Sequence, residues 1–132
     1  SNLGYSMPSY ISRDAKVYTN EIGRCVIIYP GTVIEPYVKI GDGCFIESSC
    51  CIGHHSIIGN FNFFAPGVTT GGGVVIGDNC FFGVSSVIAS GKEIAEKTVI
   101  GAGVCVTSNI GKETVLRHSE AIQLSKKPEH YI

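Results

Sequence analysis

The chain lacks long apolar runs, an excess of charge of one sign and paired-cysteine motifs. None of its 132 residues belongs to an apolar run of more than a few residues, so we expect no membrane-spanning segment. We also expect no signal peptide, because no basic segment precedes an apolar stretch. The formal net charge of −1 argues against a surface for nucleic acid or anionic membranes. The length suits one domain with a modest core.

What the sequence has instead is a six-residue repeat. Fifteen positions at this spacing follow one another, and all are bulky and apolar except Thr70. Glycine often follows the repeated residue, and a small or β-branched residue often stands two places before it. Six residues turn an α-helix by about 600°, which would scatter these positions around it. The repeated positions are Ile22, Ile28, Ile34, Ile40, Ile46, Ile52, Ile58, Phe64, Thr70, Ile76, Phe82, Ile88, Ile94, Ile100 and Val106.

The repeat predicts an all-β parallel β-helix, in which each hexad is one short strand followed by a bend. We expect the glycine after the repeated residue to form the bend, since glycine tolerates backbone angles that other residues avoid. The pattern resembles that of hexapeptide-repeat proteins. This resemblance implies three hexads per turn, a left-handed coil and about five turns between residues 22 and 111; spacing alone does not show handedness.

The period also divides the chain. Residues 1–10 have no period and are interpreted as a linker or lead-in. The β-helix domain is predicted over 11–111, with an irregular first rung at Ile11 and Val17. Residues 112–132 are predicted to form an irregular C-terminal cap and tail, because an uncovered rung exposes unpaired backbone.

The six cysteines are interpreted as free thiols. Cys44, Cys50 and Cys80 occupy the small inward position of the repeat, where they act as small apolar residues. No C-x-x-C spacing indicates zinc or redox chemistry, and no metal is expected. Free thiols are typical of a reducing compartment, so we expect a cytoplasmic protein.

Residues that precede the repeated positions point outward, and with an 18-residue turn every third one lies on the same side. One such column contains three phenylalanines, which is a large apolar patch for the surface of a monomer. We expect it to be buried against another subunit; the alternative is cover by the chain's own tail. The column consists of Ile27, Phe45, Phe63, Phe81 and Val99.

Two adjacent histidines, His54 and His55, fall on a corner of the predicted coil. One turn above them lie Gly72 and Gly73, which leave a notch where a ligand can lie along the backbone. An exposed imidazole beside a notch is suited to general-base catalysis. The alternative is a polar turn without function. His118 and His130 lie in the predicted tail and are expected to be solvated.

Three stretches, 52–59, 64–67 and 75–83, resemble the β-helix sugar O- and N-acyltransferases, including sialic-acid O-acetyltransferases and nucleotide-amino-sugar N-acetyltransferases. The resemblance implies an acyl-CoA substrate, most often acetyl-CoA, and a sugar or nucleotide-sugar acceptor. It makes His54 the general base. The family often has an acidic residue where this chain has His55, a histidine at Phe63 and an asparagine at Glu47. We therefore expect Phe63 to contact the substrate, and Glu47 either to contact the substrate or to orient the base.

The resemblance also implies a homotrimer that binds CoA in the groove between adjacent subunits, through backbone groups of successive rungs. Many members carry an N-terminal nucleotide-sugar-binding domain, and residues 4–5 and 8–12 resemble the linker after it. This chain is therefore expected to be either the catalytic part of a longer protein or a complete short one. The matching CoA-binding positions are Gly72, Gly73, Gly83, Ser85, Ser86, Ala102 and Gly103.

Two other functions stay open at this point. A γ-type carbonic anhydrase shares the prism but needs three zinc-binding histidines across a subunit interface, and the adjacent pair His54–His55 does not supply them. A non-catalytic scaffold or binding module explains the repeat, but not the histidine corner beside three glycines.

Overall fold

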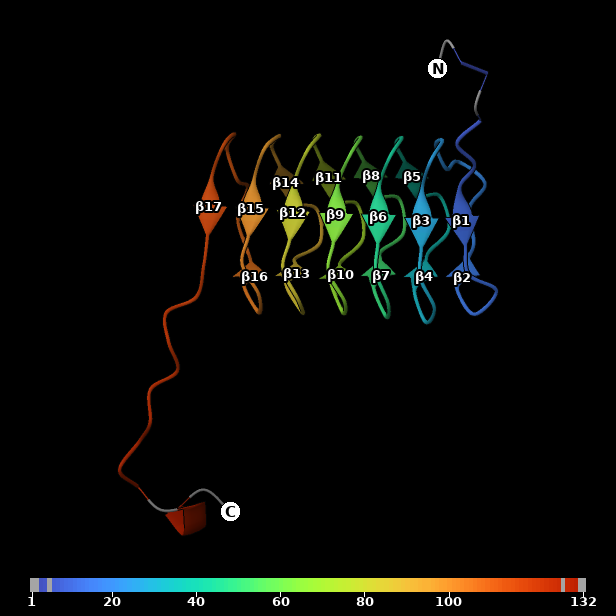
Figure 1. Cartoon of the computed structure of the whole chain (residues 1–132). Helices are drawn as coiled ribbons and strands as arrows, with labels where there is room; N and C mark the ends of the chain where they lie inside the picture. The colour runs from blue at the N-terminus through green and yellow to red at the C-terminus, as the bar shows by residue number, and fades with distance from the viewer. Residues whose placement is uncertain (1–2, 5, 127, 131–132) are drawn as a thin grey trace.

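The chain folds as a parallel β-helix with three sheets, as the repeat predicts (Figure 1). The computed structural model describes residues 3–4, 6–126 and 128–130. The remaining residues of the predicted lead-in (1, 2 and 5) and tail (127, 131 and 132) lie outside the described residues. Among the described residues, no helix has the length and apolarity that crossing a membrane requires.

Each sheet is a stack of two-residue strands. Sheet A contains β1 (Tyr10–Ile11), β3 (Ile27–Ile28), β6 (Phe45–Ile46), β9 (Phe63–Phe64), β12 (Phe81–Phe82), β15 (Val99–Ile100) and β17 (Val115–Leu116). Sheet B contains β2 (Lys16–Val17), β4 (Val33–Ile34), β7 (Cys51–Ile52), β10 (Thr69–Thr70), β13 (Val87–Ile88) and β16 (Cys105–Val106). Sheet C contains β5 (Lys39–Ile40), β8 (Ile57–Ile58), β11 (Val75–Ile76) and β14 (Glu93–Ile94).

The strand register confirms a turn of three hexads. Ile28 pairs with Ile46 and Ile34 pairs with Ile52, so consecutive coils are 18 residues apart. The repeated residues fill the interior of the prism, where Phe64 and Phe82 stack with ring centroids 4.7 Å apart. Burial of each such side chain contributes about 1.5–3 kcal/mol, which explains why the period holds over the whole stack.

The three corners of each coil form three edges that run along the prism. The A–B edge consists of residues 29–32, 47–50, 65–68, 83–86 and 101–104. The B–C edge consists of 35–38, 53–56, 71–74 and 89–92. The C–A edge consists of 23–26, 41–44, 59–62, 77–80 and 95–98.

The predicted role of the glycines that follow the repeated residues is wrong. The left-handed backbone angle occurs three places after the repeated residue, for example at Tyr37 (φ 64°), His55 (φ 60°) and Phe61 (φ 56°). Glycines such as Gly53 serve a different purpose. A Cβ added to Gly53 would lie 2.4 Å from the backbone of Gly71, so glycine is needed there because adjacent coils approach closely.

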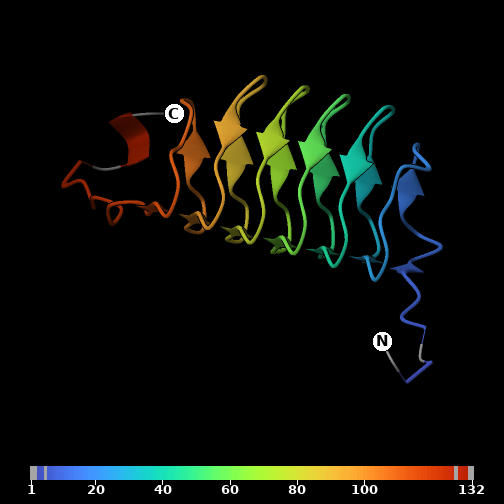
Figure 2. The same cartoon turned by 90° about the horizontal axis from the view of Figure 1, so that it is seen from above.

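The ends of the prism depart from the 18-residue turn. Ile11 pairs with Ile28 across 17 residues, and Ile100 pairs with Leu116 across only 16. Sheets A, B and C have seven, six and four strands, giving about six turns rather than the predicted five. The predicted cap adds only β17 to the prism; the described residues after it are exposed and lead away, with one 3-10 turn at Pro128–His130 (Figures 1 and 2). The left-handed coil stays a prediction.

The predicted outward column lies on sheet A, and its residues are in register. Its rings touch in sequence: Phe45 and Phe63 meet edge-to-face with centroids 5.2 Å apart, and Phe63 stacks on Phe81 at the same distance. Phe81 remains 43% exposed. The described residues of the tail therefore leave Phe81 open, and Val99 is also 38% exposed.

Candidate active site

The histidine pair lies on the B–C edge, between β7 and β8, with both side chains exposed. The main chain of His54 is held from both neighbouring coils. Its amide donates to Oε2 of Glu35 at 2.6 Å, and its carbonyl accepts from the amide of Gly73 at 2.8 Å. The backbone that carries the two imidazoles is thus fixed by the coils before and after it.

The two imidazoles are in contact. Nδ1 of His54 lies 3.0 Å from Nδ1 of His55, and the rings meet edge-to-face with centroids 5.3 Å apart. A hydrogen bond between two ring nitrogens requires that one is protonated and the other is not. The state of the Nδ1 pair therefore sets the state of the outer nitrogen of neutral His54: Nε2 has a lone pair if Nδ1 of His54 donates, and carries the proton if Nδ1 accepts.

The predicted glycine notch is only half open. A Cβ added to Gly72 would lie 2.5 Å from Cε1 and 2.6 Å from Nε2 of His54, so the His54 ring itself fills the space over Gly72. A Cβ added to Gly73 would have no atom within 4 Å. The space for a ligand is therefore beside Gly73, and Gly72 serves to let the imidazole lie flat against the next coil.

The structure separates the other predicted site residues from the histidines. Gly83, Ser85, Ala102 and Gly103 lie on the A–B edge, and sheet B stands between that edge and the B–C edge. Within one chain, the predicted CoA-binding residues therefore form two clusters. The tail adds to the second cluster, because Nε2 of His118 contacts the carbonyl oxygen of Gly103.

Ser86 does not fit its predicted role. It is fully buried among the inward positions of the A–B edge, and its Oγ has no partner among the described residues. The predicted contact with CoA was through the backbone, but the amide of Ser86 donates to the carbonyl of Gly83 and its carbonyl accepts from the amide of Thr69. The whole residue is buried because it occupies the small inward slot of the repeat, so it cannot reach a ligand on the surface.

The two predicted substrate contacts also lie on the other side of the molecule. Phe63 belongs to the outward column of sheet A, and Glu47 follows β6 at the start of the A–B edge. Both are half-buried, and neither touches the histidine pair within the chain.

Two residues near the histidines were missed in the sequence. Glu35 holds the His54 amide, and Tyr37 stacks on His55 with ring centroids 4.8 Å apart and an interplanar angle of 28°. The 18-residue turn could have identified Tyr37, because it stands one coil before His55.

The thiols are free, as predicted, and Cys44, Cys50 and Cys80 are buried. Burial raises the pKa of the Cys50 thiol to about 11. Among the described residues, no three His, Cys, Asp or Glu side chains lie close enough together to hold a metal ion.

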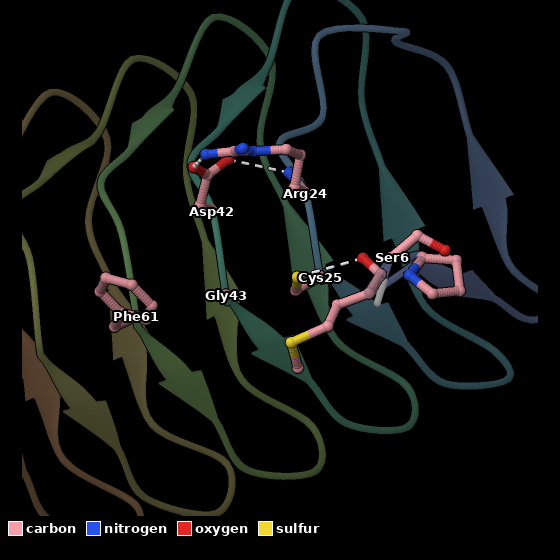
Figure 3. A pocket seen from close by; sticks show the side chains of 8 residues that line it. Ser6, Arg24, Cys25, Asp42, Gly43 and Phe61 are labelled. Atoms are coloured by element: carbon pink, nitrogen blue, oxygen red, sulfur yellow. Dashed lines mark hydrogen bonds and ion pairs between the residues drawn. The ribbon is translucent and has the colours of Figure 1, made fainter. Parts of the chain in front are cut away.

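A hollow of about 520 Å³ lies on the C–A edge, away from the histidines (Figure 3). Arg24 and Asp42 form an ion pair of 3.1 Å at its rim, and the thiol of Cys25 donates to the carbonyl of Met7 at 3.1 Å. The backbone amide of Arg24, and then its guanidinium, hold the pKa of Asp42 below its usual range. The hollow is lined by Ser6, Met7, Pro8, Arg24, Cys25, Asp42, Gly43 and Phe61.

The coils and the histidine edge define a β-helix of the hexapeptide-repeat class, and comparisons with known proteins agree. The model of the bacterial transferase hexapeptide matches residues 21–54 and 37–72, and the model of the hexapeptide repeat of succinyl-transferase matches 73–108. The chain belongs to the hexapeptide-repeat transferase family. No curated protein matched the sequence.

Solved structures share the fold at low sequence identity. The acetyltransferase domain of PglB from Neisseria gonorrhoeae aligns with a TM-score of 0.82 and 21% identity, over 86% of this chain and 56% of that one. That domain has also been solved with acetyl coenzyme A. PerB from Caulobacter crescentus, solved with CoA and GDP-perosamine, aligns with a TM-score of 0.66 and 24% identity, over 86% and 56%. WeeI from Acinetobacter baumannii aligns with a TM-score of 0.76 and 24% identity, over 79% of this chain and 52% of that one. The chain thus spans about half the length of these relatives.

Proposed function

We propose that this chain is the catalytic β-helix of an acyl-CoA-dependent acyltransferase that moves an acyl group, most simply acetyl, to an amine or hydroxyl of a sugar. The observation that carries the proposal is the contact of the two imidazoles over Gly72, with the open space of Gly73 beside them. An exposed, positioned imidazole is what proton removal from an acceptor requires. PglB and PerB, which share the fold, were solved with acetyl coenzyme A and with CoA and GDP-perosamine, and this supports the donor and a nucleotide-linked acceptor.

His54 is the general base in this reaction. The acceptor nitrogen or oxygen attacks the thioester carbonyl while its proton passes to Nε2 of His54. The resulting tetrahedral intermediate collapses as the C–S bond breaks, and the proton on His54 passes to the departing CoA sulfur. The products are the acylated sugar and free CoA, and the base is regenerated.

We further propose that the active form is a homotrimer. The partly exposed aromatic column on sheet A supports a subunit interface, since such a patch is large for a monomer surface. A second copy is also the simplest way to bring the A–B edge, with Gly83, Ser85 and Gly103, opposite the histidines of the B–C edge. In this arrangement CoA lies between subunits, and Glu47 and Phe63 reach the acceptor of a neighbouring copy.

We also propose that the acceptor is nucleotide-linked, that the whole protein has a further N-terminal domain, and that it is cytoplasmic. The free thiols support the last of these.

The function is tested by acyl transfer from acetyl-CoA to a panel of amino sugars and nucleotide-linked amino sugars, including GDP-perosamine, with release of CoA as the measurement. His54→Ala should lower turnover by about 10²–10⁴-fold and leave acetyl-CoA binding intact. His55→Ala should cost less. A chain that binds acetyl-CoA but transfers nothing to any acceptor would be a binding module, and zinc-dependent CO₂ hydration would make it a carbonic anhydrase.

The trimer is tested by sedimentation of Phe81→Glu beside a matched control, Val75→Glu. Both residues point outward and are similarly exposed, at 43% and 41%, but Val75 lies on sheet C. Phe81→Glu should dissociate the trimer, whereas Val75→Glu should leave it whole. A wild-type monomer at micromolar concentration would overturn this part of the proposal.

A further inference from the structure

Tyr37 and His55 form a stacked pair that spans two coils of the B–C edge. Both residues have a left-handed backbone, with φ of 64° and 60°. Because they occupy the same position of consecutive coils, their side chains leave the edge in the same direction. Their ring centroids are 4.8 Å apart. The next residues in this series are Gly73 and Gly91, so the stack contains two rings and ends at His55.

The stack restricts how the His55 ring can turn. Tyr37 covers one face of the imidazole, and the edge of the ring meets His54 with Nδ1 at 3.0 Å from Nδ1. Turning the plane of the His55 ring about its Cβ–Cγ bond would break the stack and move Nδ1 away from His54. The tyrosine ring thus holds the ring plane in which the two Nδ1 atoms face each other, and the contact between the two Nδ1 atoms favours this face of the ring over its flipped form.

We propose that Tyr37 is a positioning residue: by stacking on the His55 ring, it keeps His55 Nδ1 against Nδ1 of His54. In the proposed reaction His55 Nδ1 then accepts the Nδ1 proton of His54 and leaves Nε2 of His54 free as the base. This inference rests on the proposed function, because only this sharing of the proton leaves a lone pair on the nitrogen over Gly72. An imidazole here replaces the acidic residue that the resemblance implied. A carboxylate only accepts protons and needs no further control, whereas an imidazole can also donate and must be held in one orientation.

Later coils have glycine at the position of Tyr37, so the tyrosine ring can be removed by substitution with glycine. Gly73 and Gly91 hold the equivalent backbone with φ of 67° and 72°, so Tyr37→Gly removes the side chain without backbone strain. Phe61→Gly is the matched control. Phe61 has φ of 56° and is 63% exposed, against 72% for Tyr37, but it lies on the C–A edge (Figure 3). Tyr37→Phe keeps the ring and removes only the hydroxyl.

The decisive measurement is the tautomer of each histidine, read from long-range ¹H–¹⁵N correlation spectra of the full chain at a pH where both rings are neutral. In the wild type we expect His54 protonated on Nδ1 and His55 protonated on Nε2. Phe61→Gly and Tyr37→Phe should retain this pattern, and Tyr37→Gly should give mixed tautomers at His54. A wild-type His54 protonated on Nε2 overturns the inference, as does an unchanged pattern in Tyr37→Gly.

Kinetics with acetyl-CoA and GDP-perosamine, or the best acceptor of the panel, give a second test. Tyr37→Gly should lower kcat about tenfold with little change in the KM for acetyl-CoA. In a His55→Glu background, where the acceptor is a carboxylate, the same change should cost less than about twofold. Equal losses in both backgrounds would show a general structural effect and reject the positioning role.

The two measurements separate this inference from the proposed function. The expected tautomers together with no acyl transfer would reject the acyltransferase and leave the role of Tyr37 standing. Normal transfer with the opposite tautomers would keep the acyltransferase and reject the role of Tyr37.

Discussion

The C–A and B–C edges have the same backbone but different side-chain ladders. On the C–A edge, side-chain oxygens accept hydrogen bonds from backbone amides of the coil before them. The amide of Arg24 donates to Oδ1 of Asp42 at 2.8 Å, the amide of Asp42 to Oδ1 of Asn60 at 2.8 Å, and the amide of Asn60 to Oδ1 of Asp78 at 2.6 Å. On the B–C edge this ladder is broken. Gly72 has no side chain to accept the amide of His54, so that amide donates to Glu35 of the preceding coil.

The comparison shows what turns a structural edge into a candidate site. On the C–A edge, each polar side chain is used to stabilise the stack. On the B–C edge, the missing side chain of Gly72 leaves room for the imidazole, and the amide of His54 is satisfied from the opposite direction. One glycine in the ladder therefore frees a histidine for chemistry without leaving an unpaired amide.

The largest expected effect comes from restoring the ladder on the B–C edge. Gly72→Asn places a side chain where the His54 ring lies, since even its Cβ would be 2.5 Å from Cε1. We expect the imidazole to be displaced and acyl transfer to fall about a hundredfold or more. Gly91→Asn is the control, because a Cβ there meets nothing within 4 Å. Full activity in Gly72→Asn would refute the assignment of His54 as base.

The edges also differ in the residues at their inward positions, and the pH dependence of the free energy of unfolding should reveal this difference. The B–C edge has Ser56, whose hydroxyl accepts the amide of Val74, whereas Cys44 and Cys80 fill the C–A edge and Cys50 the A–B edge. Burial raises the pKa of Cys50 from 9.0 to about 11, so the unfolded chain loses this proton first. The protonated Cys50 thiol therefore contributes about 2–3 kcal/mol to the free energy of unfolding below about pH 9, and this contribution is lost as the pH rises towards 11. Denaturant unfolding between pH 8 and 11 should show this loss, and Cys50→Ser should reduce it.

Breaking the ladder of the C–A edge should affect stability and not catalysis. Asp78→Ala removes the acceptor of the Asn60 amide and should lower the free energy of unfolding by about 1–2 kcal/mol. Asp14→Ala, an exposed carboxylate outside the ladder, is the control for chemical denaturation. A large loss of turnover in Asp78→Ala with the prism intact would contradict the division between the two edges.

The smallest effect is expected at Glu35. Glu35→Gln keeps an oxygen that accepts the His54 amide, whereas Glu35→Ala leaves that amide to water. We expect Glu35→Ala to cost about 0.5–1.5 kcal/mol of stability and Glu35→Gln to cost less. Thermal unfolding of both variants measures the difference. If Gln were as damaging as Ala, the carboxylate charge rather than the hydrogen bond would be what matters.

The period predicted most of the fold, and the reason is physical. Inward positions such as Ile28 and Ile46 depend on burial alone, which a single sequence displays directly. The outward column of Phe45, Phe63 and Phe81 was predicted from the same six-residue period and the 18-residue turn. The role of Gly53 did not, because it depends on how closely the next coil approaches, and the sequence does not show that distance.

The candidate site was predicted less completely. His54, His55, Gly72 and Gly73 were brought together because they share one edge. Gly83 and Gly103 lie on another edge, and only the resemblance, which implies CoA in the groove between two subunits, grouped them with the histidines. The buried position of Ser86 follows from the repeat, which puts it in the small inward slot, whereas its predicted contact with CoA came from the resemblance alone.

The stepped ends of the prism have a consequence for self-association. A coil of identical turns would present three complete strand edges to another copy and could polymerise end to end into a fibre. Here the last turn is two residues short, and the three sheets stop at β17, β16 and β14. A second molecule cannot pair with all three sheets at once without a gap. We therefore expect the shortened turn to disfavour end-to-end stacking of two prisms, while side-by-side association through sheet A is unaffected.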